Sequence, residues 1–282
     1  MDRAVSPQRR VVLITGASSG IGRVCAEYLH GRGYHVYGTS RRAAMPGETD
    51  ARPVDDTFRL IRMDVDDDAS VQRGIDYILE REGRLDVLVN NAGVGLEGAV
   101  EEIAIDEAKA EFETNFFGML RVCRAALPSM RARGDGLIVN MSSMGGRVGI
   151  PFQGMYSATK FAMEGISEAM RLELAPFGVR VVLVEPGKYL TRFVDNSRRA
   201  AESEAQDSPY RPYAERMRRL ARGQPAAPIE QIPILLERII ESPAPRMRYA
   251  PGPLRHRAGI VLKGLLPWRL MEWAFHQYLK RA

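Results

Sequence analysis

Cysteine and histidine are scarce in this chain of 282 residues, and long apolar runs are absent. The two cysteines, Cys25 and Cys123, form no CxxC pair, which excludes a disulfide scaffold and argues against secretion. The four histidines never occur at the spacing of a zinc site, and no stretch of 18 apolar residues is present to cross a membrane. The opening residues MDRAVSPQRR carry no apolar leader segment, so we expect a cytoplasmic protein.

Basic charge is concentrated at the C-terminal end. Residues 246–282 contain eight Lys or Arg side chains and one acid, Glu272, which is a net charge of +7. The rest of the chain holds 32 basic and 34 acidic side chains, a net charge of −2. A basic patch confined to one segment indicates local attraction to an anionic surface, and no RNP, zinc-finger or helix-turn-helix pattern accompanies it. We therefore predict no nucleic-acid partner.

Short β-branched runs alternate along the chain with longer segments of helical period. This alternation is typical of βαβ units, so we predict an α/β fold, a Rossmann-like doubly wound parallel sheet in a single domain over residues 1–250. The predicted strands are 11–15, 35–39, 58–63, 86–90, 137–141 and 179–184, and the predicted helices are 21–31, 68–82, 106–132 and 156–176. Residues 194–228 are rich in Arg and Pro, and we predict that they form a surface lid over the site.

A glycine-rich turn, TGASSGIG, follows the first predicted strand and opens the first predicted helix. Gly16 permits the sharp turn, Gly20 lets the backbone approach a phosphate, and Gly22 allows the helix to pack closely on the sheet. The helix N-terminus then offers free N–H groups to a pyrophosphate. A plain strand-to-helix turn is the alternative, but the position in a βαβ unit favours a dinucleotide site.

The end of the second predicted strand bears on the choice between the two nicotinamide dinucleotides. An acidic residue there would bind a free ribose hydroxyl, but no Asp or Glu occurs from Tyr28 through Gly47. Arg41 follows the strand instead, and a guanidinium group suits a 2′-phosphate. We therefore predict that NADP(H) is favoured over NAD(H), with Arg41 and Ser18 as the phosphate contacts. The alternative is that Arg41 is an ordinary solvated charge.

Tyr156 and Lys160 lie four residues apart in a predicted helix, so their side chains share one face. A phenol titrates at about pH 10, and an adjacent cation lowers its pKa towards the range that is useful for acid-base catalysis. Ser157 and Lys160 also spell SxxK, but the partner motifs of serine acylases are absent. We therefore exclude nucleophilic serine chemistry.

The ordered set of motifs resembles the short-chain dehydrogenase/reductase family over residues 11 to about 191. The glycine-rich turn is followed by Asp64, by NNAG at 90–93 and by Asn115. Ser143 precedes Tyr156 by 13 residues, and PGKYLT at 186–191 matches the family's PGxxxT. Each motif alone is weak, whereas the ordered set is specific.

The resemblance implies that hydride passes between a nicotinamide ring and a substrate carbon. Tyr156 would exchange a proton with the substrate oxygen, while Lys160 would lower the pKa of the phenol and hold the nicotinamide ribose. Ser143 would hydrogen-bond the substrate oxygen, and Asn115 would anchor a water that relays protons through Lys160. Ser142 is the competing serine, and the family's spacing favours Ser143.

The resemblance also implies a set of cofactor-binding residues. These are Gly16, Ser18, Ser19, Gly20, Ile21, Gly22, Arg41, Asp64, Val65, Asn91, Ala92, Gly93, Tyr156, Lys160, Pro186, Gly187 and Thr191. Asp64 and Val65 would meet the adenine, and Thr191 would contact the nicotinamide amide. No metal ligand is implied.

Within the family, the sequence resembles the branch that acts on steroids, retinoids and other lipophilic alcohols (17-beta-hydroxysteroid dehydrogenase-like). This resemblance is carried by NAGVGL at 91–96, GIPF at 149–152 and YSATKFAMEG at 156–165. It implies a substrate site formed by Ser143 and by the apolar residues Met144, Phe152, Met155, Tyr189 and Phe193. The alternative is that the apolar side chains simply pack the core.

Residues 251–282 extend beyond the family's minimal chain as a basic amphipathic C-terminal extension. After Pro267, apolar residues fall on one helical stripe and polar residues on the opposite one, and both tryptophans, Trp268 and Trp273, lie here. Such a helix either docks on the domain or a second subunit, or makes peripheral contact with an anionic membrane. Both interpretations remain open from the sequence.

The combined prediction is an NADP(H)-dependent oxidoreductase that interconverts a hydrophobic ketone or aldehyde and its alcohol, with Tyr156 as the acid and base. The alternative is a catalytically silent NADP(H)-binding regulatory or scaffold protein. The presence of Asn115, Ser143 and Lys160 beside Tyr156 argues against that alternative. The resemblance further implies a homodimer or homotetramer assembled through helices 106–132 and 156–176.

Overall fold

A parallel sheet of seven strands forms the centre of the computed structural model, which describes residues 10–44, 58–189, 197–224, 226–253, 263 and 266–280. The strands are hydrogen-bonded in the order β3-β2-β1-β4-β6-β7-β9. In chain order they are β1 (Val11–Ile14), β2 (His35–Ser40), β3 (Arg59–Arg62), β4 (Val87–Asn90), β6 (Gly136–Met141), β7 (Val179–Val184) and β9 (Arg248–Tyr249). The chain crosses from one side of β1 to the other between β3 and β4, which confirms the predicted doubly wound sheet.

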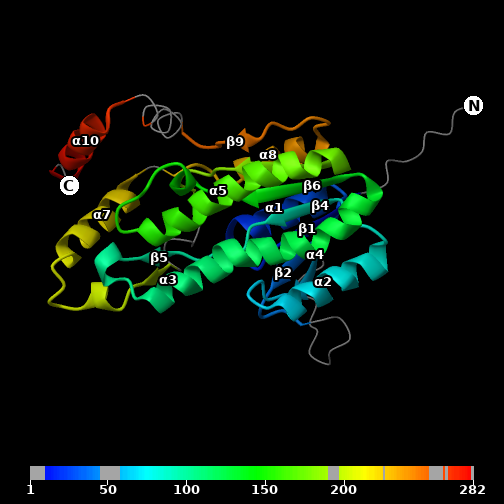
Figure 1. The fold of residues 1–282 in the computed structure, drawn as a ribbon, viewed down its shortest axis with the longest axis horizontal. Coiled ribbons are helices and arrows are strands. Elements are labelled where there is room, and N and C mark those ends of the chain that lie inside the picture. The colour runs from blue at the N-terminus through cyan, green and yellow to red at the C-terminus, as the bar shows by residue number, and fades with distance from the viewer. Residues whose placement is uncertain are drawn as a thin grey trace, which may run out of the picture.

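Helices cover both faces of the sheet (Figure 1). On one face lie α2 (Asp68–Glu82), α4 (Gly118–Arg133) and α5 (Gly154–Leu174), and on the other lie α1 (Gly20–Gly31) and α8 (Gln231–Glu241). Two apolar clusters fill the space between the layers, because alternate strand residues point to opposite faces. The strands are therefore buried on both sides, as their nearly continuous apolar runs predict.

The predicted helix 106–132 is interrupted in the middle. It consists of α3 (Ile105–Phe112), a π-helical turn η2 (Glu113–Phe117) and then α4. A π-helical turn inserts one residue into the helical repeat and is frequent at functional sites. Asn115 lies inside this turn, so the irregular backbone coincides with a predicted site residue.

Several elements lie in segments where the sequence predicted no regular structure. The predicted lid 194–228 holds β8 (Arg198–Arg199), η5 (Glu202–Glu204) and α7 (Arg211–Gly223), so its described part is largely helical. β8 pairs with β5 (Leu96–Glu97) in a separate two-stranded sheet. Short helical turns η1 (Val100–Glu102), η3 (Met144–Gly146) and η4 (Ala175–Phe177) complete the domain. Ala200, Ala214 and Ala227 of this lid are buried, which anchors an otherwise polar segment.

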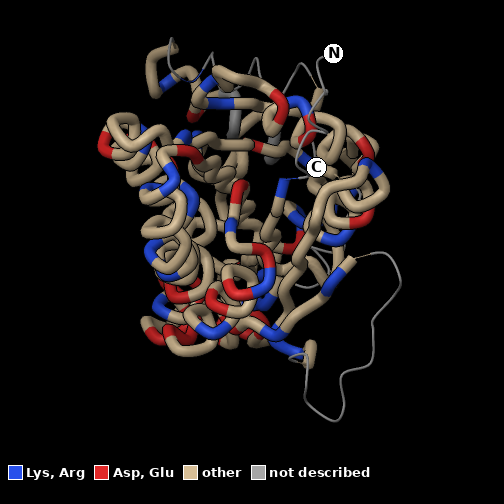
Figure 2. Tube along the Cα trace, turned by 90° about the vertical axis from the view of Figure 1, so that its right-hand side faces the viewer, with Lys and Arg blue, Asp and Glu red and all other residues tan. Residues whose placement is uncertain are grey.

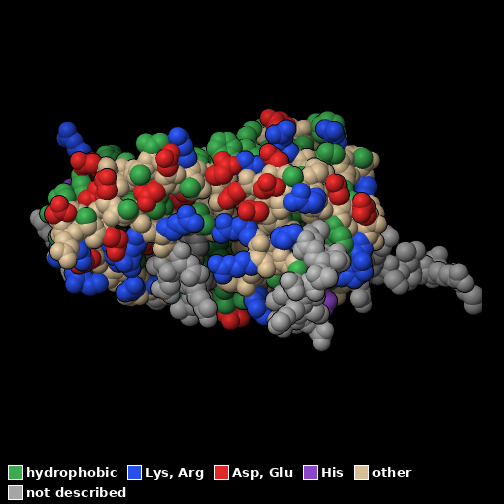
Figure 3. Space-filling view, turned by 90° about the horizontal axis from the view of Figure 1, so that it is seen from below, with side chains coloured by type: hydrophobic (Ala, Val, Ile, Leu, Met, Phe, Trp, Pro, Cys, Tyr) green, Lys and Arg blue, Asp and Glu red, His purple; other side chains and the backbone are tan. Residues whose placement is uncertain are grey.

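The C-terminal extension contains α10 (Trp268–Lys280), which Figure 1 shows at the edge of the molecule, at the same end as α7. Trp268, Leu270 and Trp273 are exposed there. In the described part of the chain, no helix is long and apolar enough to cross a membrane. Acidic and basic residues alternate over the covering helices, and the face in Figure 3 shows both signs of charge interspersed (Figures 2 and 3).

Candidate active site

The loop between β1 and α1 is closed on its sheet side and open on the other. A Cβ atom at Gly16, where φ is +66°, would lie 2.9 Å from the Cα atom of Ala92. A Cβ atom at Gly22 would lie 2.5 Å from the Nδ2 atom of Asn91. Gly20 also has a positive φ of +59°, but no atom lies within 4 Å of its Cβ position. The loop therefore packs tightly on the end of β4 and leaves the face beside Gly20 accessible.

Thr15 ties this loop to the segment that follows β4. Its Oγ1 atom accepts hydrogen bonds from the backbone N–H groups of Asn91, at 3.0 Å, and of Ala92, at 2.9 Å. The Asn91 side chain donates in return to the backbone oxygen of Thr15 at 2.9 Å. The sequence motif includes Thr15, but no role was predicted for it. Its position directly before the first glycine of the loop could have indicated one.

The residues around α1 fit a nucleotide pyrophosphate. Ser19 is the N-cap residue of α1, and its side chain caps no backbone N–H group of the helix. The first turn of α1 contains no acidic residue, so nothing there opposes a negative charge. Ser18 and Ser19 are exposed beside the open face of the loop. The uncapped N–H groups and the missing Cβ atoms together form a cradle for a phosphate.

The adenosine end of the predicted cofactor site is polar. Arg41 is exposed after β2. Burial raises the pKa of Asp66, and the charge of Arg41 offsets part of this shift. Asp64 follows β3, and its Oδ1 atom accepts a hydrogen bond from the N–H group of Asp66 at 3.2 Å. Val65 is buried beside these acids. Arg41 is thus placed at the carboxyl edge of the sheet, where the sequence placed the 2′-phosphate contact.

Tyr156 and Lys160 lie in the first two turns of α5. The Nζ atom of Lys160 donates to the backbone oxygen of Met141 at 2.9 Å and lies 5.7 Å from the centroid of the Tyr156 ring. Ser143, the N-cap of η3, hydrogen-bonds Tyr156 and lowers the pKa of its phenol. The structure therefore brings Ser143, Tyr156 and Lys160 together at the carboxyl ends of β6 and β7. Ser143, rather than Ser142, is the serine beside the phenol.

The pKa values of the two α5 groups differ from the sequence prediction. Burial and, to a smaller extent, the nearby Glu111 raise the pKa of Tyr156 to about 12. Burial lowers the pKa of Lys160 to about 8. The sequence predicted that Lys160 lowers the pKa of the phenol, but in this structure Ser143 has that effect and burial outweighs it.

Asn115 has a positioning role in the structure. Its Oδ1 atom accepts from the N–H group of Val94 at 2.8 Å, and its Nδ2 atom donates to the Val94 oxygen at 2.9 Å and to Thr159 Oγ1 at 3.1 Å. Both side-chain donors are therefore used within the protein. The side chain joins the loop after β4 to α5. The role of Asn115 in anchoring a water stays a prediction.

Glu111 is a site residue that sequence reasoning missed. It lies in α3, one turn before Asn115, and is only 2% exposed. Its Oε1 atom accepts a hydrogen bond from the N–H group of Leu96 at 3.0 Å, and burial raises its pKa to about 7. The available signal was the spacing of four residues to Asn115, which places both on one helix face.

The predicted substrate residues separate into two groups. Phe152, whose φ of +63° is unusual for a bulky side chain, lines a cavity of about 470 Å³. Met155 instead packs on the small cluster around Leu96, and Tyr189 is buried in the core beside α8, which matches the core alternative. Met144 is half-buried in η3. Phe193 and the predicted cofactor contact Thr191 lie outside the described residues. Of the other predicted cofactor residues in this segment, Pro186 accepts a backbone hydrogen bond from Met144, and Gly187 donates one to Pro251.

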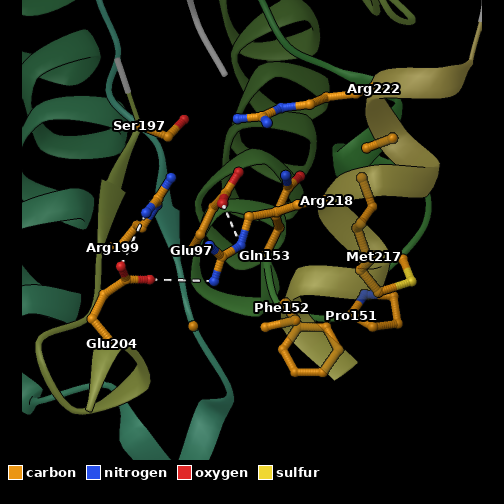
Figure 4. Close-up of a pocket in the computed structure, with 14 residues that line it drawn as sticks. Glu97, Pro151, Phe152, Gln153, Ser197, Arg199, Glu204, Met217, Arg218 and Arg222 are labelled. Atoms are coloured by element: carbon orange, nitrogen blue, oxygen red, sulfur yellow. Dashed lines mark hydrogen bonds and ion pairs between the residues drawn. The ribbon is translucent and has the colours of Figure 1, made fainter. Parts of the chain in front are cut away.

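The cavity lies between the N-terminus of α5, the small sheet and α7 (Figure 4). Ile150, Pro151, Phe152 and Met217 form its apolar wall. On the other side Arg218 lies between Glu97, at 3.8 Å, and Glu204, at 3.2 Å. Arg199 pairs with Glu204 at 2.9 Å, and Arg222 extends into the cavity from α7. The cavity is therefore apolar on one side and charged on the other.

Relatives of known name match most of the chain. The 3-ketodihydrosphingosine reductase of Bacteroides thetaiotaomicron is 45% identical over 203 residues, which cover 72% of each chain. Retinol dehydrogenase 8 of Bos taurus is 42% identical over 190 residues, which cover 65% of this chain and 60% of that protein. These similarities confirm the predicted resemblance to the branch named for lipophilic alcohols.

Solved structures share the fold over nearly the whole length. A short-chain dehydrogenase from Streptomyces avermitilis has a TM-score of 0.79 and 34% identity and covers 97% of this chain, which in turn covers 98% of that structure. A short-chain dehydrogenase from Burkholderia cenocepacia in complex with NADP has a TM-score of 0.70 and 26% identity, with coverages of 96% and 98%. One from Burkholderia phymatum in complex with NAD has a TM-score of 0.75 and 26% identity, with coverages of 94% and 95%.

The family model described as short chain dehydrogenase matches residues 10–202, the part of the chain that holds the glycine-rich loop, Asn115, Ser143, Tyr156 and Lys160. The chain therefore belongs to the short-chain dehydrogenase/reductase family of oxidoreductases.

Proposed function

We propose that this protein is an NADP(H)-dependent oxidoreductase that interconverts a hydrophobic ketone or aldehyde and its alcohol, with Tyr156 as the acid and base. One observation carries the proposal. The Tyr156 phenol hydrogen-bonds Ser143 and lies beside the Lys160 ammonium, so a proton donor and a second hydrogen-bond donor stand together near the N-terminus of α5. Gln153, the N-cap residue of α5, lines the cavity, whereas Ser143, Tyr156 and Lys160 are not among its lining residues.

The Tyr156 phenol is protonated at neutral pH. Because its pKa is raised to about 12, it holds the proton that a reduction needs but is a weak acid, so transfer to a carbonyl oxygen requires that the phenolate left behind be stabilised. Ser143 would donate a second hydrogen bond to the same oxygen and stabilise the charge that develops there. Lys160, whose Nζ atom is fixed by the Met141 oxygen, would lie beside the phenolate that remains.

The glycine-rich loop, Asn91 and Lys160 would hold the dinucleotide. When bound, its nicotinamide ring supplies hydride to the substrate carbon or accepts it. The solved relatives include one complex with NADP and one with NAD, so similarity alone does not select between them. The exposed guanidinium of Arg41 after β2 and the nearby Ser18 support NADP(H).

The cofactor preference is tested by equilibrium binding of NADPH and NADH. We expect NADPH to bind more tightly, and Arg41→Ala to weaken NADPH at least about tenfold with little effect on NADH, because a charge-assisted pair to phosphate contributes roughly 1.5–3 kcal/mol. Arg42→Ala is the matched control, since Arg42 is the next residue and is equally exposed. A wild-type affinity for NADPH no higher than for NADH would refute the preference.

A lipophilic substrate is supported by the apolar wall of the cavity and by the relatives. Ile150, Pro151, Phe152 and Met217 offer an adaptable hydrophobic surface beside the N-terminus of α5. The two relatives described above are named for a ketosphingoid base and for retinol, which are both long apolar molecules that carry a reacting oxygen. The exact ketone is a matter for a substrate panel.

Initial rates of NADPH and NADH oxidation against a ketosphingoid, retinal, ketosteroids and medium-chain ketones test the activity. We expect turnover with NADPH, and a loss of about 10²- to 10⁴-fold in kcat for Tyr156→Phe, which removes only the acidic hydroxyl. Turnover that survives in Tyr156→Phe would refute the role of the phenol. Tight NADPH binding without turnover on the panel would favour the catalytically silent alternative.

Two assembly properties belong to the same proposal. The exposed Trp268, Leu270 and Trp273 in a basic segment support peripheral contact of α10 with an anionic membrane. Sedimentation with anionic liposomes that weakens at high salt is the expected result, and no sedimentation at low salt would refute the contact.

Exposed apolar side chains on η2, α5 and η4 support a homodimer or homotetramer; they are Phe117, Phe161, Leu172 and Phe177.

A further inference from the structure

Glu111 is a buried acid for which the mechanism above has no use. It lies in α3, is 2% exposed and is held through Oε1 by the N–H group of Leu96. Among the described residues, its Oε2 atom has no hydrogen-bond partner although it is fully buried. A buried carboxyl oxygen without a partner costs less free energy when the group is protonated and neutral than when it is charged, and a role that uses this proton would explain its presence.

The surroundings of Glu111 connect it to the α5 pair. Glu111 raises the pKa of both Lys160 and Tyr156, and Lys160 lowers the pKa of Glu111 in return. The other charged group that acts on Lys160 is Glu164, also on α5. Asn115, one turn after Glu111, fixes the α3–η2 segment against α5 through Thr159. The carboxyl is therefore held within electrostatic reach of both groups that move protons.

We infer that Glu111 is the proton reservoir of the site: its carboxyl supplies a proton to Lys160, which in turn restores the proton of Tyr156. The inference rests on the proposed function, because it assigns a step of the same reaction. Glu111 touches neither substrate nor reacting atoms, so it is a positioning and relay residue that acts through Lys160.

The steps balance for reduction. Hydride forms the new C–H bond at the carbonyl carbon, and the O–H bond of Tyr156 breaks as its proton passes to the substrate oxygen. The phenolate is reprotonated by way of the Lys160 ammonium, and the neutral amine takes the proton of the Glu111 carboxyl. The carboxylate is finally protonated from solvent. One hydride and one solvent proton are consumed for each alcohol formed.

The pKa values of Glu111 and Lys160 suit proton transfer between them. Burial brings the pKa of Glu111 to about 7 and that of Lys160 to about 8, so a proton passes between them without a large free-energy step. Proton exchange is most efficient between groups that titrate near the working pH. An ordinary surface glutamate, ionised throughout this range, would have no proton to supply.

The test compares pH profiles of kcat for wild type, Glu111→Gln and Glu111→Asp. Gln keeps the oxygen that accepts from Leu96 N–H but cannot supply a proton. We expect kcat of Glu111→Gln to fall at least about tenfold at pH 7. We also expect the wild-type profile to show a limb near pH 7, a change of kcat with pH as Glu111 titrates, and this limb to be absent in Glu111→Gln. Glu111→Asp should restore part of that limb. Glu113→Gln is the matched control and should keep the wild-type profile, because Glu113 is a half-exposed acid two residues away that pairs with Arg121.

A uniform loss of kcat in Glu111→Gln, with the limb near pH 7 unchanged, would show a merely structural role and overturn the inference. A wild-type profile in that variant would overturn it as well. The second readout needs no substrate: infrared difference spectra of the protein should show a protonated carboxyl that titrates near pH 7 and is lost in Glu111→Gln. A spectrum that is the same in both proteins would overturn the inference.

The two proposals fail differently. If the protein turns over none of the ketones, the proposed function fails while the infrared titration of Glu111 still reports on the reservoir. If turnover is rapid and Glu111→Gln keeps the wild-type pH profile, the reservoir fails and the proposed function stands.

Discussion

At the scale of single residues, glycines of the same helix differ in what a side chain would meet. A Cβ atom at Gly22 would lie 2.5 Å from Asn91 Nδ2 and 2.6 Å from the Gly16 oxygen, whereas nothing lies within 4 Å of the Cβ position of Gly31. We expect Gly22→Ala to displace the β1–α1 loop and to weaken NADPH binding at least about tenfold, because backbone and a hydrogen-bonded amide must shift. Equilibrium binding measures the loss. Gly31→Ala, at the end of α1, is the control and should bind as wild type does.

Glu111 also makes stability depend on pH. Its pKa is about 7 in the folded protein and about 4.5 in the unfolded chain, so between these values the folded state binds more protons. Wild-type stability should therefore fall as pH rises through this window, by up to roughly 3 kcal/mol, because one pKa unit corresponds to about 1.4 kcal/mol. We expect Glu111→Gln to gain in urea-unfolding free energy relative to wild type between pH 5 and pH 8. A difference that is the same at both pH values would contradict this.

At the scale of elements, ion pairs to buried carboxylates join the last strand of the sheet to α5. Arg248 of β9 lies 3.1 Å from Glu164 of α5 and 3.1 Å from Glu185 after β7, and it also pairs with Glu168. Glu164 and Glu185 are buried. Arg147 shares Glu185 at 3.1 Å. The network fixes the position of α5, and with it Tyr156, against the edge of the sheet.

We expect Arg248→Met to destabilise the protein by about 3–5 kcal/mol at pH 7.5, because it leaves the buried carboxylate of Glu164 without its ion-pair partner and Glu185 with Arg147 alone. Burial already raises the pKa of Glu164, and removal of Arg248 raises it further. The loss should therefore shrink at pH 5.5, where the folded state takes up protons. Urea unfolding at the two pH values measures this. Arg199→Met, from an exposed pair with Glu204, is the control and should cost less than about 1 kcal/mol.

At the scale of the whole molecule, exposed apolar side chains on α5 bear on assembly. Leu172 is 77% exposed in the single chain, so a charge there should not disturb folding. We expect Leu172→Glu to lower the oligomeric mass measured by light scattering, because the charge would be buried in an interface through this helix. Val100→Glu is the control, since Val100 is 66% exposed and lies on η1. An unchanged mass for Leu172→Glu would place the interface elsewhere.

The whole fold also shows where sequence reasoning succeeded. The strand at Val179–Val184 and the helix at Asp68–Glu82 have the predicted bounds, because each carries a strong local period and a turn signal at its end. The glycine-rich loop and the Tyr156–Lys160 pair were also readable, since both depend on spacing within one element. By contrast, β9 has two residues and no period of its own, so only its pairing with β7 reveals it.

The sequence by itself determined the doubly wound architecture, the family and the spacing of the residues proposed for catalysis, because these follow from local periodicity and ordered motifs. Only the tertiary structure decided that α7 walls the cavity, that Tyr189 packs in the core, and that Glu111 is buried within electrostatic reach of Lys160. The physical reason is burial. Desolvation and contacts between segments distant in sequence set the pKa values and the cavity, and no local pattern encodes them.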